Sequence, residues 1–216
     1  MKKFVFVSDF DGTLTKKDFY KILSDEYYKE EIKDMYNNWQ NGEIKDVDYL
    51  GYIFKNIKRN ETEILEDIMK ISLDPFAKQF IERIKALGGD FVIVSAGTSY
   101  YIEKVLKMQG IEDVKVYSNK AVFKDNGLHF DLDEKDEFYS NIFGIDKEKV
   151  VKKLKNEYSK VFYAGDSRPD VKAALESDLV FAKRKLVNLL KEEGKDFIEF
   201  DSFSEIIEKV ENYLRE

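Results

Sequence analysis

The stretch FVFVSDFDGTLT, residues 4–15, decides the fold class of this chain. Its aromatic and β-branched residues without polar breaks predict a buried strand over residues 3–8. The apolar run ends abruptly at Asp9 and Asp11, which are followed by Gly12. If the backbone is still extended there, residues i and i+2 point to the same side, and both carboxylates converge on one spot. Like charges beside a buried strand cost free energy, so the stretch raises the question of what offsets that cost.

Composition limits the class of protein. The 216 residues suffice for one sizeable domain or for one domain with an insertion. The chain has no cysteine, which excludes disulfides, thiolate nucleophiles and cysteine-ligated zinc. A formal net charge of −7 argues against nucleic acid as a partner, and no apolar run approaches the roughly 20 residues that span a bilayer. We therefore expect a cytoplasmic protein with no membrane partner; no oligomeric state is indicated.

Strands alternate with helical segments, which predicts an α/β fold with a Rossmann-like, mostly parallel sheet flanked by helices. Residues 16–74 interrupt this alternation with a helical pattern, which predicts a core of residues 1–15 and 75–216 and a second helical domain of residues 16–74. A β-hairpin is expected over residues 121–132, with Asn126 and Gly127 supplying the positive φ angles of its turn. The other strands are expected at 91–95, 114–117, 161–164, 179–182 and 197–200. The other helices are expected at 75–87, after residue 95 with an end near Gly110, at about 147–158, from Pro169, up to Gly194 and at 202–214.

Three predicted strands end in polar, glycine-containing turns: SDFDGT (8–13), SAGTS (95–99) and AGDSRPD (164–170). Ligands bind at the carboxyl ends of strands in such sheets, so these turns together predict one site. Asp166 and Asp170 are spaced i, i+4 and share one face of a helix that begins there. Together with Asp9 and Asp11 they make four carboxylates. In a partly dry cleft these charges need a cation, and Mg²⁺ is the expected one. Because Mg²⁺ commonly bonds to substrate phosphate, the cluster points to phosphoryl chemistry.

The residue types present exclude several kinds of nucleophile. Cysteine is absent, and the only histidine, His129, falls in the predicted hairpin, so a Ser-His-Asp triad has no obvious base. A carboxylate can itself attack phosphorus and form an aspartyl-phosphate. A neighbouring carboxylate, whose pKa is raised by nearby negative charge, can then protonate the leaving group.

Phosphate contacts are predicted in the second turn and at a lysine that begins a helix. The Ser95 hydroxyl and the backbone N–H groups of Ala96 and Gly97, at the start of a helix, can cradle an anion. A lysine should balance the remaining charge. Lys147, which opens a helix, is the first candidate, and Lys149 is the alternative.

Contacts to the rest of the substrate are harder to place. Thr13 is a further phosphate-binding candidate, or else it only caps its own loop. Asp18 and Tyr100 are candidate substrate contacts, whose alternatives are a solvated acid and a packing residue. Other aromatic residues either line a pocket or pack in the protein: Tyr20, Trp39, Tyr49, Tyr52 and Tyr101.

DFDGT, the SAG turn, a lysine at a helix start and GDSRPD, in this order, resemble the four motifs of the haloacid dehalogenase superfamily. The resemblance implies that Asp9 is the nucleophile and Asp11 the general acid and base. It also implies that Ser95 and Lys147 bind the transferring phosphoryl group. The implied Mg²⁺ ligands are the Asp9 side chain, the Asp11 backbone carbonyl, Asp166 and, directly or through water, Asp170.

The helical insertion matches the cap of the phosphoserine-phosphatase-like branch, and a cap of this kind closes over the substrate. VYSNKAVF (116–123), GDSRPDVKAALESDLVFAK (165–183) and FIEFDSFSEI (197–206) look similar to methionine-salvage phosphatases acting on 2-hydroxy-3-keto-5-methylthiopentenyl-1-phosphate. They resemble phosphoethanolamine/phosphocholine phosphatases less closely. Two departures stand out: DEKDEFYSNIFGID (133–146) replaces the cysteine-rich stretch of the bacterial salvage enzyme, and YLGYIFKNI (49–57) lacks the cap arginine of phosphoserine phosphatases, Arg59 being the nearest.

We therefore expect a Mg²⁺-dependent phosphomonoesterase acting on a small phosphorylated metabolite, with the methionine-salvage phosphate as the first candidate substrate. The alternatives within the same chemistry are phosphoserine and phosphoethanolamine or phosphocholine. Asp11 argues against a dehalogenase, which needs no second aspartate, whereas a phosphomutase is left open. The alternative of another class is a catalytically idle phosphate-binding or regulatory protein.

Overall fold

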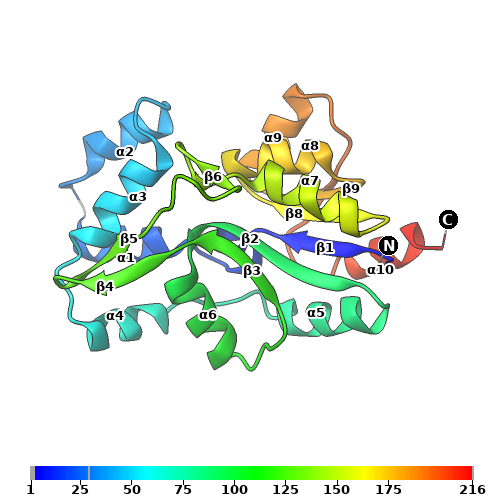
Figure 1. Ribbon diagram of the computed structural model, residues 1–216, viewed down its shortest axis with the longest axis horizontal. Coiled ribbons are helices and arrows are strands. Elements are labelled where there is room, and N and C mark those ends of the chain that lie inside the picture. The colour runs from blue at the N-terminus through cyan, green and yellow to red at the C-terminus, as the bar shows by residue number, and fades with distance from the viewer. Residues whose placement is uncertain (1–2, 29, 216) are drawn as a thin grey trace.

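A six-stranded sheet forms the centre of the computed structural model, which describes residues 3–28 and 30–215 (Figure 1). Its strand order is β10-β9-β8-β1-β2-β3, and every neighbouring pair is parallel. This confirms the predicted α/β class with a Rossmann-like sheet. The strands of the sheet are β1 (Val5–Ser8), β2 (Asp90–Thr98), β3 (Lys115–Asn119), β8 (Val161–Gly165), β9 (Leu179–Ala182) and β10 (Ile198–Glu199).

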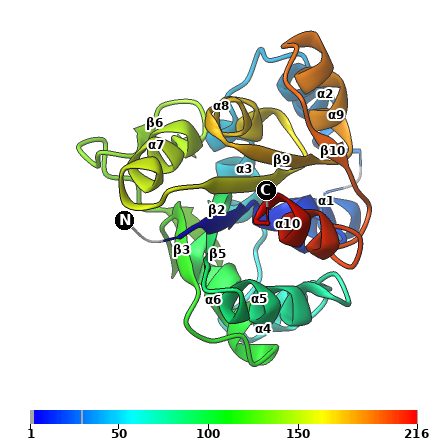
Figure 2. The same cartoon turned by 90° about the vertical axis from the view of Figure 1, so that its right-hand side faces the viewer.

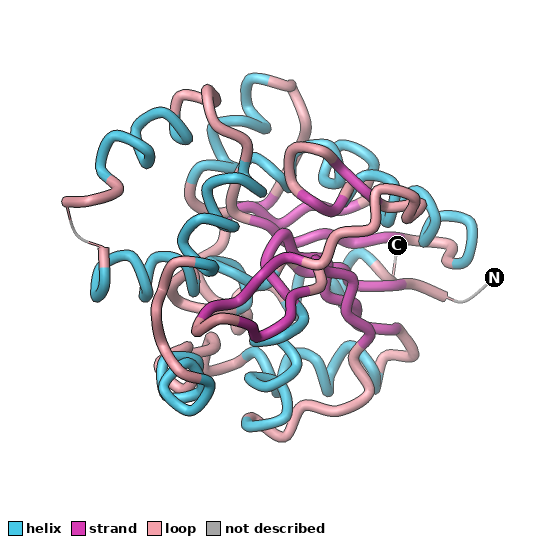
Figure 3. The backbone as a smooth tube through the Cα atoms, turned by 60° about the vertical axis from the view of Figure 1, so that its left-hand side comes forward, coloured by secondary structure: helices cyan, strands magenta, loops and turns pink. Residues whose placement is uncertain are grey.

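The alternation of residues along β1 explains why helices cover both faces of the sheet (Figures 2 and 3). Phe4 and Phe6 point into the core under α5, α6 and α10, whereas Val5 and Val7 point into the core under α7, α8 and α9. All four side chains are fully buried. The helices are α5 (Ala77–Ala86), α6 (Ser99–Met108), α7 (Lys147–Glu157), α8 (Val171–Glu176), α9 (Lys185–Glu192) and α10 (Ile207–Tyr213).

Four helices between β1 and α5 lie beyond the carboxyl ends of the strands (Figure 1). The two chain segments that lead into and out of this unit run side by side. Lys16 N–H donates to Ser72 O at 2.9 Å, and Asp74 N–H donates to Leu14 O at 2.9 Å. Entry and exit are therefore tied at one place. The helices are α1 (Phe19–Tyr27), α2 (Lys33–Gln40), α3 (Asp46–Lys55) and α4 (Glu61–Ile68), and we call them the helical cap.

The predicted hairpin is present as β4 (Ala121–Lys124) and β5 (Gly127–Phe130), but its turn differs from the prediction. The positive φ angles belong to Asp125 (49°) and Asn126 (57°), and Gly127 has none. Gly127 is needed for a close approach instead, because a Cβ there would lie 2.3 Å from the carbonyl oxygen of Lys55. The hairpin thus packs against the end of α3, and a glycine that was assigned to turn geometry serves contact with the cap.

Several element bounds shift from their predicted places. The first strand is shorter than 3–8, and the helix expected at 202–214 begins only at Ile207. β2 runs past residue 95 to Thr98, with an irregularity in its pairing to β3 between Ser95 and Thr98. A small antiparallel pair, β6 (Tyr139–Ser140) with β7 (Gly144–Ile145), was not predicted. Among the described residues, no helix is long and apolar enough to cross a membrane.

Candidate active site

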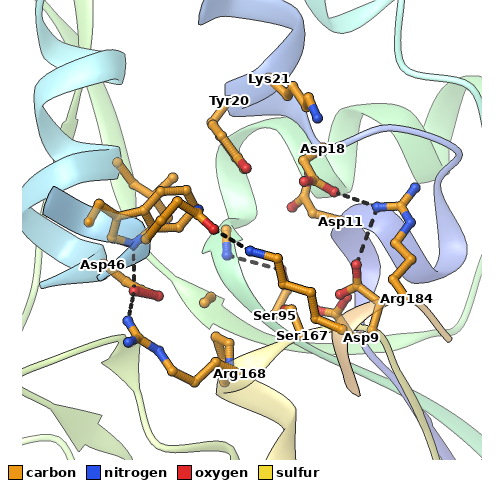
Figure 4. Close-up of a pocket in the computed structure, with 18 of the residues that line it drawn as sticks. Asp9, Asp11, Asp18, Tyr20, Lys21, Asp46, Ser95, Ser167, Arg168 and Arg184 are labelled. Atoms are coloured by element: carbon orange, nitrogen blue, oxygen red, sulfur yellow. Dashed lines mark hydrogen bonds and ion pairs between the residues drawn. The ribbon is translucent and has the colours of Figure 1, made fainter. Parts of the chain in front are cut away.

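Three loops meet because β1 lies between β2 and β8 in the sheet. The last residue of β1, Ser8, is paired with Ile93 on one side and with Ala164 on the other. The turns that follow these strands therefore emerge at the same edge. Together with the helical cap they enclose a cavity of about 550 Å³ (Figure 4).

Asp9 and Lys147 form an ion pair at the bottom of this cavity. Lys147 Nζ lies 2.7 Å from Asp9 Oδ1 and 2.6 Å from Asp170 Oδ1. Burial raises the pKa of Asp9 to about 6, although the Lys147 charge opposes this shift. Burial alone would lower the pKa of Lys147, but the charges of Asp170 and Asp9 outweigh it and raise that pKa. Lys149 is half-exposed and lies near Asp146 instead.

Asp170 is fully buried and accepts four hydrogen bonds. Its Oδ1 accepts from Lys147 Nζ and from the Tyr163 hydroxyl at 2.7 Å, and its Oδ2 accepts from the backbone N–H groups of Asp166 and Ser167, both at 3.0 Å. These bonds use the lone pairs that a carboxylate offers. Asp170 therefore fixes both the lysine and the loop that carries Asp166.

Asp9, Asp166 and Asp170 could hold a metal ion. One oxygen from each lies within 4.8 Å of the others. Asp9 Oδ2 is buried and has no hydrogen-bond partner among the described residues, and burial together with the Asp9 and Asp170 charges raises the pKa of Asp166 well above its usual value. An unpartnered buried oxygen within an acidic cluster fits a hard divalent cation. The Asp11 side chain lies outside this cluster.

The Asp11 carboxylate is held by two donors of different origin. The Tyr101 hydroxyl, from α6, donates to Asp11 Oδ2, and the backbone N–H of Phe19, in the first turn of α1, donates to Oδ1 at 2.9 Å. Burial and the nearby Asp18 charge raise the pKa of Asp11 to about 7, although both hydrogen bonds oppose the shift. This pKa suits a group that gives and takes protons near neutral pH.

The predicted phosphate cradle lies in the cavity wall but differs in detail. Ser95, Ala96 and Gly97 all line the cavity. The strand continues to Thr98, however, so the helix begins only at Ser99, and the Gly97 N–H donates to Ser95 Oγ at 3.0 Å. Thr13 is fully buried below the first loop, and its hydroxyl has no hydrogen-bond partner among the described residues.

Asp18 lines the cavity and is paired with Arg184. Arg184 Nη1 lies 3.3 Å from Asp18 Oδ1 and 3.2 Å from Asp166 Oδ2, and its Nη2 donates to Lys16 O at 2.7 Å (Figure 4). These groups leave no room at Gly12, where a Cβ would lie within 2.5 Å of all three side chains. Because Gly12 has no side chain, Arg184 can reach Asp166 across the DFDGT loop.

The cap side of the cavity is largely aromatic. Tyr20, Trp39 and Phe54 line it, and a second ion pair joins cap and core there. Arg168 Nη2 lies 2.9 Å from Asp46 Oδ1, which also accepts from Trp39 Nε1 at 2.7 Å (Figure 4).

Two residues considered as substrate contacts lie elsewhere. Tyr100 does not line the cavity, and its hydroxyl donates to Glu61 at 2.9 Å, so its neighbour Tyr101 takes the place expected for it. Arg59 lies near Glu63 and Asp67 within the cap, and it does not line the cavity either.

Arg184 and the Arg168–Asp46 pair were missed by sequence reasoning. Arg184 follows β9, whose carboxyl end lies at the same edge of the sheet as the three turns. The basic run after LVFA (179–182) is therefore a usable sequence signal, because it marks a fourth strand end at this edge. Arg168 and Asp46 are 122 residues apart, and no local pattern predicts such a pair.

Comparisons with known proteins find phosphatases similar to this chain. The model of a family described as "Putative Phosphatase" matches residues 4–199. A 2-hydroxy-3-keto-5-methylthiopentenyl-1-phosphate phosphatase of Bacillus pumilus is 27% identical over 95% of this chain and 90% of its own length. A polyol phosphate phosphatase of Saccharomyces cerevisiae is 28% identical over 99% of this chain and 95% of its own length.

Solved structures show the same fold. A substrate-bound phosphoserine phosphatase superposes with a TM-score of 0.71 at 19% identity, covering 97% of this chain and 99% of that one. A phosphoserine phosphatase from T. onnurineus gives a TM-score of 0.69 at 22% identity, covering 98% and 96%. The family match over residues 4–199 shows that the chain belongs to the "Putative Phosphatase" family, so it is a phosphatase, with the fold that its four motifs predicted from their resemblance to the haloacid dehalogenase superfamily.

Proposed function

We propose that the protein is a Mg²⁺-dependent phosphomonoesterase that hydrolyses a small phosphorylated metabolite through an aspartyl-phosphate on Asp9. The observation that supports this most directly is the Asp9 carboxylate. Lys147 holds one of its oxygens, while the other, Oδ2, is buried without a hydrogen-bond partner among the described residues. This oxygen therefore has unused hydrogen-bonding capacity, on a residue that lines the cavity together with Ser95.

Each residue has one part in the reaction. Asp9 attacks phosphorus, and the bond between phosphorus and the leaving oxygen breaks while Asp11 gives that oxygen a proton. In the second step Asp11 takes a proton from water, the water oxygen bonds to phosphorus, and Asp9 is released. Lys147 and Ser95 bind the equatorial phosphoryl oxygens, where charge builds up in the transition state.

Mg²⁺ would be held by Asp9, Asp166 and the Asp11 backbone carbonyl, and when bound it neutralises charge on the phosphoryl oxygens. Asp170 already accepts four hydrogen bonds within the protein, so its part is to support the site or to bind the cation through water. Thr13 would stabilise the first loop next to the bound phosphate.

The cavity favours a leaving group without a positive charge. Its two acids on the substrate side, Asp18 and Asp46, are each paired with an arginine, so neither is free for an ammonium group. The remaining wall combines aromatic rings and the neutral side chains of Gln40 and Asn188 with the cationic side chains of Lys21 and Lys185, and none of these groups is an acid that could bind an ammonium group. A neutral, hydroxyl-bearing metabolite fits this wall, and 2-hydroxy-3-keto-5-methylthiopentenyl-1-phosphate and polyol phosphates are such compounds. Phosphoserine, phosphoethanolamine and phosphocholine carry an amine and fit it less well.

The purified protein should hydrolyse p-nitrophenyl phosphate with Mg²⁺ and lose this activity in EDTA, with recovery on added Mg²⁺. Asp9→Asn should abolish turnover while the thermal melting curve stays cooperative. A panel containing the methionine-salvage phosphate, glycerol and sorbitol phosphates, phosphoserine, phosphoethanolamine and phosphocholine then tests the leaving group. Full activity in Asp9→Asn would contradict the mechanism, and a preference for the amines would contradict the proposed substrate class. No activity on any phosphate would favour an idle, phosphate-binding protein.

A further inference from the structure

We propose that Tyr101 is a positioning residue for the proton transfer, holding the Asp11 carboxyl in the orientation that faces the leaving oxygen. This inference rests on the proposed function, because it concerns how Asp11 delivers and takes its proton. Tyr101 is 1% exposed, and its hydroxyl donates to Asp11 Oδ2.

Two hydrogen bonds fix the plane of the Asp11 carboxyl. Tyr101 engages Oδ2 and the Phe19 backbone N–H engages Oδ1 at 2.9 Å, so the group cannot rotate without breaking one of them. General acid catalysis depends on a proton held within hydrogen-bond reach of its target. With only one of these donors, the Asp11 carboxyl would stay in the cavity but could rotate about its bond to Cβ.

The Tyr101 ring is itself held from both domains. It packs against Phe10 of the first loop at 6.1 Å between ring centroids, against Phe19 of α1 at 4.7 Å and against Phe54 of α3 at 6.2 Å. The hydroxyl therefore has little freedom to move away from Asp11. Because two of the three rings belong to the cap, the direction of the Asp11 carboxyl depends on a seated cap.

Gly97 is a second, independent observation that supports the contact between Tyr101 and Asp11. A Cβ at this position would lie 1.7 Å from the Tyr101 hydroxyl oxygen and 2.6 Å from Asp11 Oδ2. Gly97 has no positive φ angle that would explain the glycine. The SAG turn thus carries a glycine where any side chain would separate the tyrosine from the aspartate.

The test compares two aryl phosphates of nearly equal size in the full-length protein with Mg²⁺. p-Nitrophenol leaves without protonation, whereas phenol is a much poorer leaving group and depends on Asp11. Tyr101→Phe removes one oxygen and keeps the packed ring. We expect kcat/KM for phenyl phosphate to fall at least about tenfold and that for p-nitrophenyl phosphate to fall less than about threefold, because general acid catalysis contributes about 10²–10⁴-fold in all.

Tyr100→Phe is the matched control, because it removes the same atom from the next residue of the same helix, whose hydroxyl contacts Glu61. It should leave both rates unchanged. Asp11→Asn should show the same discrimination between substrates as Tyr101→Phe but more strongly. The double variant should be no worse than Asp11→Asn alone if Tyr101 acts through Asp11.

Inhibition by inorganic phosphate and the melting temperature separate positioning from damage to the fold. Both should match the wild type in Tyr101→Phe, because the Asp9–Lys147–Ser95 region is untouched. Equal losses on both aryl phosphates, or rates equal to those of Tyr100→Phe, would overturn the role of Tyr101. If the wild type hydrolyses neither aryl phosphate, it is the proposed function that fails.

Discussion

The two ends of the cavity are built in different ways. At the end proposed to bind phosphate, Asp9, Lys147 and Asp170 are at most 4% exposed, lie at the edge of the central sheet and are joined by charge-assisted hydrogen bonds. At the leaving-group end, the cap presents aromatic rings, and its ion pair to the core ends on Arg168, whose side chain is 44% exposed. Substituting one partner of a buried ion pair costs several kcal/mol, whereas substitutions in a partly solvated wall cost little. The wall can therefore vary between proteins that act on different substrates. Under the proposed function, the phosphoryl chemistry would therefore be fixed at one end, and selectivity would reside at the other.

The largest effect should follow from breaking the phosphate end. Lys147→Met removes the cation between Asp9 and Asp170, which leaves two buried carboxylates without their partner. We expect kcat for p-nitrophenyl phosphate to fall about 10³-fold, because a donor aimed at the developing charge is lost. Steady-state kinetics at saturating Mg²⁺ measures this loss.

Lys149→Met is the matched control for that experiment. Lys149 lies two residues further along α7, and its side chain is 52% exposed. Its removal should change kcat by less than about twofold, since a surface ion pair contributes little. A loss in Lys149→Met as large as that in Lys147→Met would show that Lys149 is the functional lysine.

A smaller effect is expected at the leaving-group end. Arg168→Gln removes the charge opposite Asp46, which is itself 4% exposed and keeps its bond from Trp39. We expect kcat/KM for the best substrate of the panel to fall about twofold to fivefold, in line with a partly exposed pair. The wild-type advantage should shrink in 0.5 M salt, which screens such a pair.

Arg168→Gln also tests the comparison between the two ends. The loss should be smaller for p-nitrophenyl phosphate, which makes fewer contacts with the cap, than for the best substrate. An equal loss for both would mean that Arg168 acts on the phosphate end, through the neighbouring Asp166, and not through the cap.

The same contrast explains what the sequence could predict. Asp9, Ser95, Lys147 and Asp166 follow strands or begin a helix, so local patterns and sheet topology place them at one edge. The cap contacts depend on how a helical unit sits on that edge. Tyr100 was predicted as a substrate contact, whereas Tyr101 lines the cavity. A one-residue step on a helix turns the side chain by about 100°, and only packing decides which tyrosine faces inward.

The Asp125–Asn126 turn shows the same limit within the fold. The Asn-Gly pair favours a hairpin and did mark one, but the glycine was required by the Lys55 backbone, which is distant in the sequence. Residues whose environment comes from their own strand or loop were predictable. Residues whose environment comes from a distant part of the chain, such as the helical cap, were not.

The smallest expected effect concerns stability, and its sign follows from the raised pKa of Asp11. In the metal-free folded protein this pKa is about 7, compared with 3.8 for the ordinary group. The folded state therefore binds more protons between pH 4 and 7, and the contribution of Asp11 to stability is lost as the pH rises through this window. Asp11→Asn removes that loss, so in EDTA we expect the variant to melt a few degrees above the wild type at pH 7.5 and close to it at pH 4.5.

Two further melting experiments, with Asp9→Asn and with added Mg²⁺, serve as controls for the Asp11→Asn measurement. The pKa of Asp9 is raised less, to about 6, and its carboxylate is paired with Lys147. Asp9→Asn leaves that lysine without one of its two acids, so its gain at pH 7.5 should be smaller than that of Asp11→Asn. Added Mg²⁺ should stabilise the wild type most at pH 7.5, where the acidic cluster is charged. If Asp11→Asn melts below the wild type at pH 7.5, then the Tyr101 and Phe19 bonds outweigh the cost of burying the charge, and Asp11 is stabilised more strongly than its raised pKa indicates.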